Sequence, residues 1–334
     1  MSVPTTVPET HGQSGDDARD ELRRVGARRL AINAAKRFHA ADGTSYARAL
    51  GLSSVLSLLP GLIGAVGIAI VFQLEDTRAV LGDAIQSLAP GPAGSVLTQA
   101  LRPGSSGLTA MVGGLGAMLI SGTFAMIHLE RGANRIYGVD EHRAGSRRFF
   151  IAFTVGATAG ILLLLGLAVI AAGGAIGESS APGGSTTGSA TDVWSILRWP
   201  IGVTLVAVPM TMIFKVAPNR RQPHFSWLLS GTAVAVALWI LVTFSLGLFY
   251  ERGPMSGAYG PILGVMALLV WAYLTAVAVL YGLSFAAELE AERAGQASPE
   301  RDASATPDDR EDDEVRREPV AGEATTAGPT TPAH

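Results

Sequence analysis

The stretch that decides the fold runs from Ala258 to Gly295, AYGPILGVMALLVWAYLTAVAVLYGLSFAAELEAERAG. It contains no Asp, Glu, Lys or Arg up to Ala287, and charge returns at Glu288. About 20 apolar residues in a helix cross the roughly 30 Å hydrocarbon layer of a bilayer. The stretch is therefore long enough to span a membrane with some tilt, and longer than a core helix of a soluble domain needs to be.

Five other stretches share this length, apolarity and lack of charge. All six together are 49–74, 103–129, 149–177, 199–214, 222–250 and 253–287. Only 16% of the 334 residues are charged and the mean hydropathy is +0.33, which agrees with a membrane protein. We therefore predict an all-α, polytopic membrane protein with six transmembrane helices, near 50–72, 109–130, 149–173, 199–216, 227–250 and 260–287.

The basic residues predict the orientation of these helices. Lys and Arg in short flanking segments are retained in the cytoplasm. With a cytoplasmic N-terminus, 21 of the 25 basic residues lie inside, and only Arg78, Arg102, Arg198 and Arg252 lie outside. The fourth helix is short and contains Pro200 and Pro209, but without it Lys215, Arg220 and Arg221 would lie outside. We predict six spans with both termini cytoplasmic.

The segments outside the spans have characters of their own. The first outer loop, 73–108, shows two runs of helical periodicity around Pro90-Gly91-Pro92, which predict an amphipathic helix pair that is interfacial or re-entrant. Segment 173–192 has the composition of a flexible linker. We predict a disordered N-terminus over 1–18, a basic amphipathic cytoplasmic helix region over 19–48, the transmembrane domain over 49–293, and a disordered acidic cytoplasmic tail over 294–334.

Catalytic motifs are not found in this sequence. There is no cysteine, and the six histidines show no metal-binding spacing, so we expect no metal, no cofactor and no enzyme activity. Ionisable residues are missing from the middle of the spans and remain at their cytoplasmic ends. The candidates for a polar cavity mouth there are Arg131, Asn134, Glu130, Pro218 and Glu288, and the candidates for helix breaks that shape a cavity are Pro60, Pro209, Pro261 and Gly260.

Arg131 has two interpretations. Its guanidinium offers five donors to a phosphate group, which a lysine reproduces poorly. Alternatively, Arg131 pairs with Glu288 and only ties two helix ends together. The polar residues at the mouth could likewise be interfacial anchors and intrahelical pairs, such as Glu130 with Asn134.

Four motifs resemble the YihY/BrkB family of bacterial inner-membrane proteins, long labelled ribonuclease BN-like and also known as UPF0761. The motifs are ALGLSSVLSLLP (Ala49–Pro60), GANRIY (Gly132–Tyr137, around a turn in the family pattern), FKVAPN (Phe214–Asn219), and YGPILG (Tyr259–Gly264) continuing through Trp271 and Tyr273 to AAELEA (Ala286–Ala291). The resemblance runs from about Arg28 to Arg293. Ala286 and Glu290 stand where the family pattern has Gly and Asn. The resemblance implies a six-helix protein of the bacterial plasma membrane without a settled biochemical activity.

Three functions follow as hypotheses. The first is transport or gating of a lipid or other amphiphilic envelope component, with membrane lipids as partners. The second is a scaffold without transport, which binds a second copy, an envelope protein or cytosolic factors. The third is the inherited ribonuclease label, which lacks a metal-binding constellation; no nucleic acid is expected as a partner.

Overall fold

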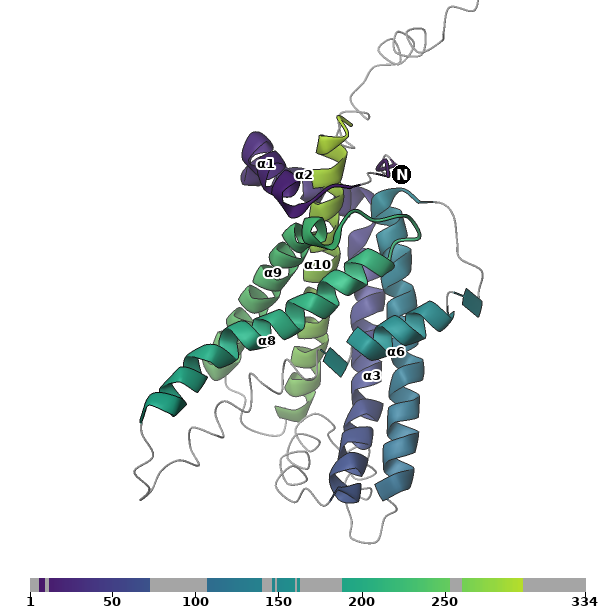
Figure 1. Cartoon of the computed structure of the whole chain (residues 1–334). Coiled ribbons are helices and arrows are strands. Elements are labelled where there is room, and N and C mark those ends of the chain that lie inside the picture. Colours follow the sequence, from purple (N-terminus) through teal and green to yellow (C-terminus); the bar gives the residue numbers. More distant parts are fainter. Residues whose placement is uncertain are drawn as a thin grey trace, which may run out of the picture.

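The computed structural model describes residues 6–9, 12–72, 107–139, 146–147, 149–159, 161–162, 188–252 and 260–296. Over these residues the protein is all-helical (Figure 1). The helices are α1 (Gly15–Val25), α2 (Ala27–Ala40), α3 (Gly43–Val71), α6 (Gly107–Tyr137), α8 (Gly188–Val216), α9 (Phe225–Arg252) and α10 (Gly260–Arg293), with a shorter apolar helix at Phe149–Ala159.

Four helices of the described residues are long and apolar enough to cross a membrane. They are Gly43–Ile68, Gly107–Tyr137, Phe225–Phe249 and Gly264–Arg293, which correspond to the first, second, fifth and sixth predicted spans. The fourth predicted span appears as the shorter apolar helix Pro200–Val216. Of the third, 149–173, the described part is helical over Phe149–Ala159. These helices support a membrane protein, but they do not establish that it has six spans. The helix pair predicted in 73–108 lies almost wholly outside the described residues.

Several helices extend beyond their predicted ends. The turn expected at Gly132–Tyr137 is instead the last part of α6, which ends at Gly138 with φ +67°. There the N–H of Val139 donates to the Asn134 carbonyl oxygen at 2.9 Å, as in a glycine C-cap. α8 begins at Gly188, inside the segment predicted to be a linker, and α10 continues to Arg293. The helical backbone thus continues from the apolar spans into the polar residues that flank them.

The predicted helix breaks at proline are wrong for two of the three prolines. α3 runs unbroken through Pro60, and α8 runs unbroken through Pro200 and Pro209 (Figure 1). Pro261 follows Gly260 in the first turn of α10, where the missing N–H would have had no helical partner. The prolines therefore do not divide the described helices into half-helices.

The N-terminal arm is not a single helix. Gly26, with φ +89°, separates α1 from α2, and Leu30, Ala34 and Phe38 of α2 are buried in the core that α2 shares with α10. The sequence predicted disorder over 1–18. In the structure, residues 6–9 contact the end of α6, and α1 begins at Gly15. The apolar side of α2 thus packs on protein.

Two pairs of glycines allow close helix packing. A Cβ atom on Gly114 of α6 would lie 2.2 Å from the Gly64 nitrogen of α3, and one on Gly282 of α10 would lie 2.6 Å from the Gly231 oxygen of α9. Small residues are the usual means by which membrane helices approach. By contrast, a Cβ atom on Gly113, Gly116 or Gly122 of α6 would have no neighbour within 4 Å among the described residues.

Burial is uneven along the helices. We call the end that contains α1, α2, the C-terminal turns of α6 and α10 and segment 217–224 the polar end. Near it, Phe214, Trp227 and Leu283 are fully buried, whereas the opposite halves of α8, α9 and α10 expose large apolar side chains. These exposed side chains include Ile196, Leu197, Ile240, Leu241, Phe244, Phe249, Met266 and Val270. The helices share a core at the polar end and present apolar surface beyond it.

Candidate functional site

The polar end is organised by three glutamates near the C-terminus of α10. Successive residues of a helix are about 100° apart, so Glu288 and Glu292 share one face and Glu290 lies on the other side. Glu288 and Glu292 contact α2, through Arg37 and Asn33 respectively. Since these partners are themselves four residues apart and in reverse order, α2 and α10 pack in an antiparallel register. The spacing of the three glutamates therefore directs Glu288 and Glu292 towards α2 and Glu290 towards a different part of the chain.

The ion pair between Arg37 and Glu288 is completely buried. Arg37 Nε donates to Glu288 Oε2 at 2.7 Å, and the two side chains are 0% and 1% exposed. Arg37 Nη1 also donates to the Ile136 carbonyl oxygen of α6 at 3.4 Å. Removing one partner of a buried pair leaves an uncompensated charge and costs about 3–5 kcal/mol. The pair thus fixes the position of α2 against the ends of α10 and α6.

A second buried pair joins Arg220 to Glu290. Arg220 Nη2 donates to Glu290 Oε1 at 2.6 Å, with side chains 3% and 0% exposed. The guanidinium also lies 4.7 Å from the centre of the Tyr137 ring, at a distance typical of a cation–π contact. Its remaining donors reach the carbonyl oxygens of Val7 and Pro8, both at 3.1 Å. One arginine therefore connects α10, α6, the α8–α9 connection and the N-terminal segment.

Two of the sequence-predicted site residues, Asn134 and Pro218, lie where α6 meets segment 217–224. Asn134 Oδ1 accepts a hydrogen bond from the backbone N–H of Asn219, at 2.7 Å, and both Asn134 and Pro218 are buried. Glu130, one turn earlier on α6, is also buried. These residues lie in the packed polar end, and none of them lines a cavity that the structure describes.

Arg131 lies apart from this group. It is exposed on α6, and the predicted alternative in which it pairs with Glu288 is wrong, because Glu288 pairs with Arg37. Its guanidinium is available to solvent or to a lipid headgroup. The phosphate interpretation of Arg131 stays a prediction.

The sequence did not reveal that Arg37 and Arg220 pair with the glutamates of α10. Arg37 follows Leu30 and Ala34 by seven and three residues, so it falls on the buried stripe of α2. A charged residue in an apolar stripe is a signal that it has a buried partner, and this could have been recognised. Arg220 gave no comparable signal, because it lies in a connection without helical periodicity.

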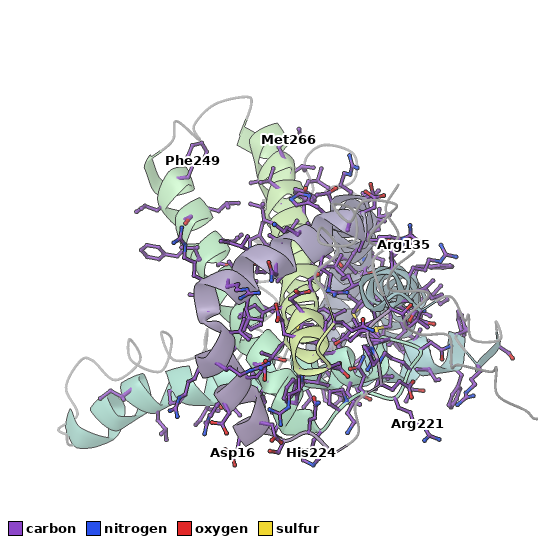
Figure 2. All side chains as sticks on the ribbon, turned by 90° about the horizontal axis from the view of Figure 1, so that it is seen from above. Asp16, Arg135, Arg221, His224, Phe249 and Met266 are labelled. Atoms are coloured by element: carbon purple, nitrogen blue, oxygen red, sulfur yellow. The ribbon has the colours of Figure 1, made fainter. Side chains whose placement is uncertain are left out.

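The rim of the polar end carries weaker contacts. Arg293 of α10 lies 3.4 Å from Asp17 and 3.6 Å from Glu21 of α1. Figure 2 shows His224 next to Asp16 of α1 at the edge of the molecule and Arg221 farther along the same edge, while Phe249 and Met266 lie on separate ribbons on the other side. Within the described ranges, no three His, Cys, Asp or Glu side chains are placed to hold a metal ion. Among the described residues, the helix ends are thus held together by buried charge pairs, with weaker contacts around them.

Known proteins resemble this chain over most of its length. The model of the family described as virulence factor BrkB matches residues 34–307. A putative ribonuclease-like protein, YfkH, of Bacillus subtilis is 27% identical over 72% of this chain and 88% of that protein.

Two proteins named UPF0761 membrane protein are also similar. The one from Alkalilimnicola ehrlichii is 28% identical over 80% of this chain, and the one from Xanthomonas campestris is 28% identical over 74% of it. The matches cover 60% and 57% of those longer proteins. No solved structure matches. Together with the apolar helices, these matches show that the chain is a membrane protein of the virulence factor BrkB family.

Proposed function

We propose that this protein moves or gates an anionic lipid or a similar amphiphile across the bacterial plasma membrane. The observation that carries this proposal is the contrast between its two ends. The polar end is closed by two buried ion pairs, Arg37 with Glu288 and Arg220 with Glu290. The far halves of α8, α9 and α10 offer uncharged, apolar side chains that suit acyl chains.

The proposed orientation places the polar end in the cytoplasm. Arg23, Arg28 and Arg29 of the arm, Arg131 of α6 and Arg221 of the α8–α9 connection are exposed there. The anionic cytoplasmic leaflet attracts such residues by about 1 kcal/mol each near the surface. Exposed cations around a closed end would concentrate anionic headgroups next to the bundle.

The orientation can be tested without changing any native thiol, because the chain has no cysteine. Single cysteines at His224 and Asp16 should react with a membrane-impermeant maleimide in inverted vesicles and not in intact cells. A cysteine at Phe249 serves as the control for the other side of the membrane. Reaction of the first two in intact cells would refute the proposed orientation.

Lipid movement can be tested in liposomes. We expect the purified protein to accelerate the exchange of fluorescent phosphatidylglycerol between leaflets, measured by quenching of the outer-leaflet dye. Phe244→Asn, on the exposed apolar half of α9, should slow the exchange. Phe124→Asn, at another exposed phenylalanine on α6, is the control and should have less effect. Exchange no faster than in protein-free liposomes would contradict the proposal.

We also propose that the protein is not an enzyme. The ribonuclease in the printed name of the Bacillus protein describes that protein. In favour of our proposal, the acidic groups Glu288 and Glu290 are occupied by buried arginines, and no third carboxylate of the described ranges joins them in a metal-binding group. Cleavage of labelled RNA by the purified protein with Mg²⁺ or Mn²⁺, lost in Glu130→Gln, would overturn this proposal.

A further inference from the structure

The N-terminal segment Thr6–Glu9 is bound to the polar end as an extended peptide. The N–H of Val7 donates to the carbonyl oxygen of Tyr137 at 3.1 Å, and the carbonyl oxygens of Val7 and Pro8 each accept from Arg220 at 3.1 Å. Thr6 Oγ1 donates to the Gly138 carbonyl oxygen at 3.2 Å. Main-chain bonds of this kind supply affinity in many peptide-recognition sites.

Two side chains add selectivity to this attachment. Val7 is only 2% exposed and belongs to the hydrophobic core, while Thr6 and Glu9 on either side are exposed. Glu9 Oε1 accepts from the backbone N–H of Arg221 at 3.0 Å. The site therefore takes an apolar side chain, a proline that needs no N–H partner, and an acid, in that order.

The site is held in place by groups outside the segment. Arg220 is fixed by its ion pair with Glu290 and by the ring of Tyr137, neither of which belongs to residues 6–9. The acceptor on Tyr137 is a backbone carbonyl at the end of α6, where the helix has no further donor of its own to offer it. The receiving surface is preformed, so the segment can leave without unfolding it.

The attachment is small compared with the helix packing around it. One buried side chain and a few hydrogen bonds hold residues 6–9, whereas α2 adds a stripe of apolar side chains and a buried ion pair. Segments with few buried contacts open at the low end of the range of local stabilities. We therefore expect the segment to open at a lower cost than α2.

We propose that the surface formed by Tyr137, Gly138, Arg220 and Arg221 is a peptide-binding site, which the chain's own residues 6–9 occupy reversibly. Its ligand class is an extended peptide with the order apolar, proline, acidic. Departure of the segment exposes the Arg220 guanidinium and the Tyr137 ring, so the segment acts as a removable cover of the polar end. This inference does not depend on lipid movement.

The test uses the full chain with single cysteines, in lipid nanodiscs, and the rate of alkylation by a polar maleimide. Val7→Cys should react on the order of tenfold more slowly than Glu9→Cys, and on the order of tenfold faster than Ala133→Cys, a fully buried control in α6, because only the segment opens.

A competing peptide completes the test. The synthetic peptide SVPTTVPETHG, residues 2–12, is supplied at about 1–10 mM, because a tethered segment has an effective concentration of that order. It should accelerate the alkylation of Val7→Cys severalfold, and the same peptide with Asp in place of Val7 should not. Arg220→Lys should also accelerate the alkylation of Val7→Cys, since it loses the bonds to two carbonyl oxygens. Lys215→Arg, at an exposed basic residue of α8 outside the site, is the matched control and should leave the rate unchanged.

The outcomes separate the alternatives. If Val7→Cys reacts as slowly as Ala133→Cys, the segment is a fixed part of the core and the inference is overturned. If it reacts as fast as Glu9→Cys, no site holds the segment. If it opens but the two peptides act alike, the surface does not recognise the apolar side chain, and the inference again fails.

Discussion

The polar end and the opposite halves of the same helices differ in how their side chains are used. In α9, Trp227 and Leu228 are fully buried near the polar end, but Phe244 and Phe249 are 69% and 70% exposed towards the other end. A residue type therefore does not determine burial in this protein. Two buried charge pairs and the Gly231–Gly282 contact hold the helices together near the polar end, and lipid is a good solvent for apolar side chains at the other.

The largest expected effect comes from breaking the Arg37–Glu288 pair. Glu288→Ala leaves the Arg37 guanidinium buried without its carboxylate and should lower the free energy of unfolding by about 3–5 kcal/mol. Intrinsic fluorescence during heating in detergent measures this as a lower midpoint. Arg19→Ala, at an exposed pair with Asp16, is the control and should cost less than about 1 kcal/mol. Equal effects would show that burial of the pair is not important.

The second prediction compares two phenylalanines. Phe214→Ala removes a fully buried ring of α8 at the polar end and should cost about 3 kcal/mol through the cavity it leaves. Phe244→Ala, on the exposed half of α9, should change stability by about 0.5 kcal/mol or less. The thermal unfolding midpoints of the two variants, compared with that of the unchanged protein, test this prediction. A large loss for Phe244→Ala would mean that this half of α9 is covered in the folded protein.

A smaller effect is expected at the crossing of α9 and α10. The methyl group of Gly282→Ala would lie 2.6 Å from the Gly231 oxygen, so the helices must separate, at a cost of about 1–3 kcal/mol. Gly247→Ala in α9 meets no atom of the described residues within 4 Å and should be neutral or slightly stabilising. Chemical crosslinking across the two helices, together with the unfolding midpoint, would detect the separation. Stability unchanged in Gly282→Ala would show that the contact is looser than described.

The smallest effect concerns the first turn of α1. The backbone N–H and the hydroxyl of Ser14 donate to the Asp17 carboxylate, and Arg293 lies nearby, so the pKa of Asp17 is below its ordinary value. A depressed folded-state pKa adds stability that is complete above the ordinary pKa and is lost as the pH falls through the folded value. Ser14→Ala should lower stability by about 1 kcal/mol at neutral pH, through loss of the helix cap.

The pH dependence provides the control for this last prediction. Asp17→Asn should flatten the acid side of the stability curve and leave the curve between neutral and mildly alkaline pH parallel to that of the unchanged protein. An unchanged acid limb, measured by unfolding at several pH values, would show that other carboxylates determine it.

The long apolar helices were predictable because hydropathy is a local sum. The charge-free runs ending at Ala287 and at Leu129 each place a helix without knowledge of any neighbour. The effect of Pro60 and Pro209 was not predictable in this way, because it is not a local property. A proline breaks a helix or not according to whether the surrounding structure compensates for the missing hydrogen bond. Of the candidate site residues, Asn134 binds Asn219, the neighbour of Pro218, whereas Arg131 is exposed on α6.

The sequence by itself determined that this chain belongs in a membrane and which segments can cross it, because about 20 consecutive apolar residues suffice for that conclusion. The tertiary structure alone decided that Glu288 pairs with Arg37, that Glu290 pairs with Arg220, and that Val7 is buried. These contacts join residues more than 60 positions apart, and they depend on how each helix is rotated about its axis and where it crosses its neighbours. No local property of the sequence contains that information.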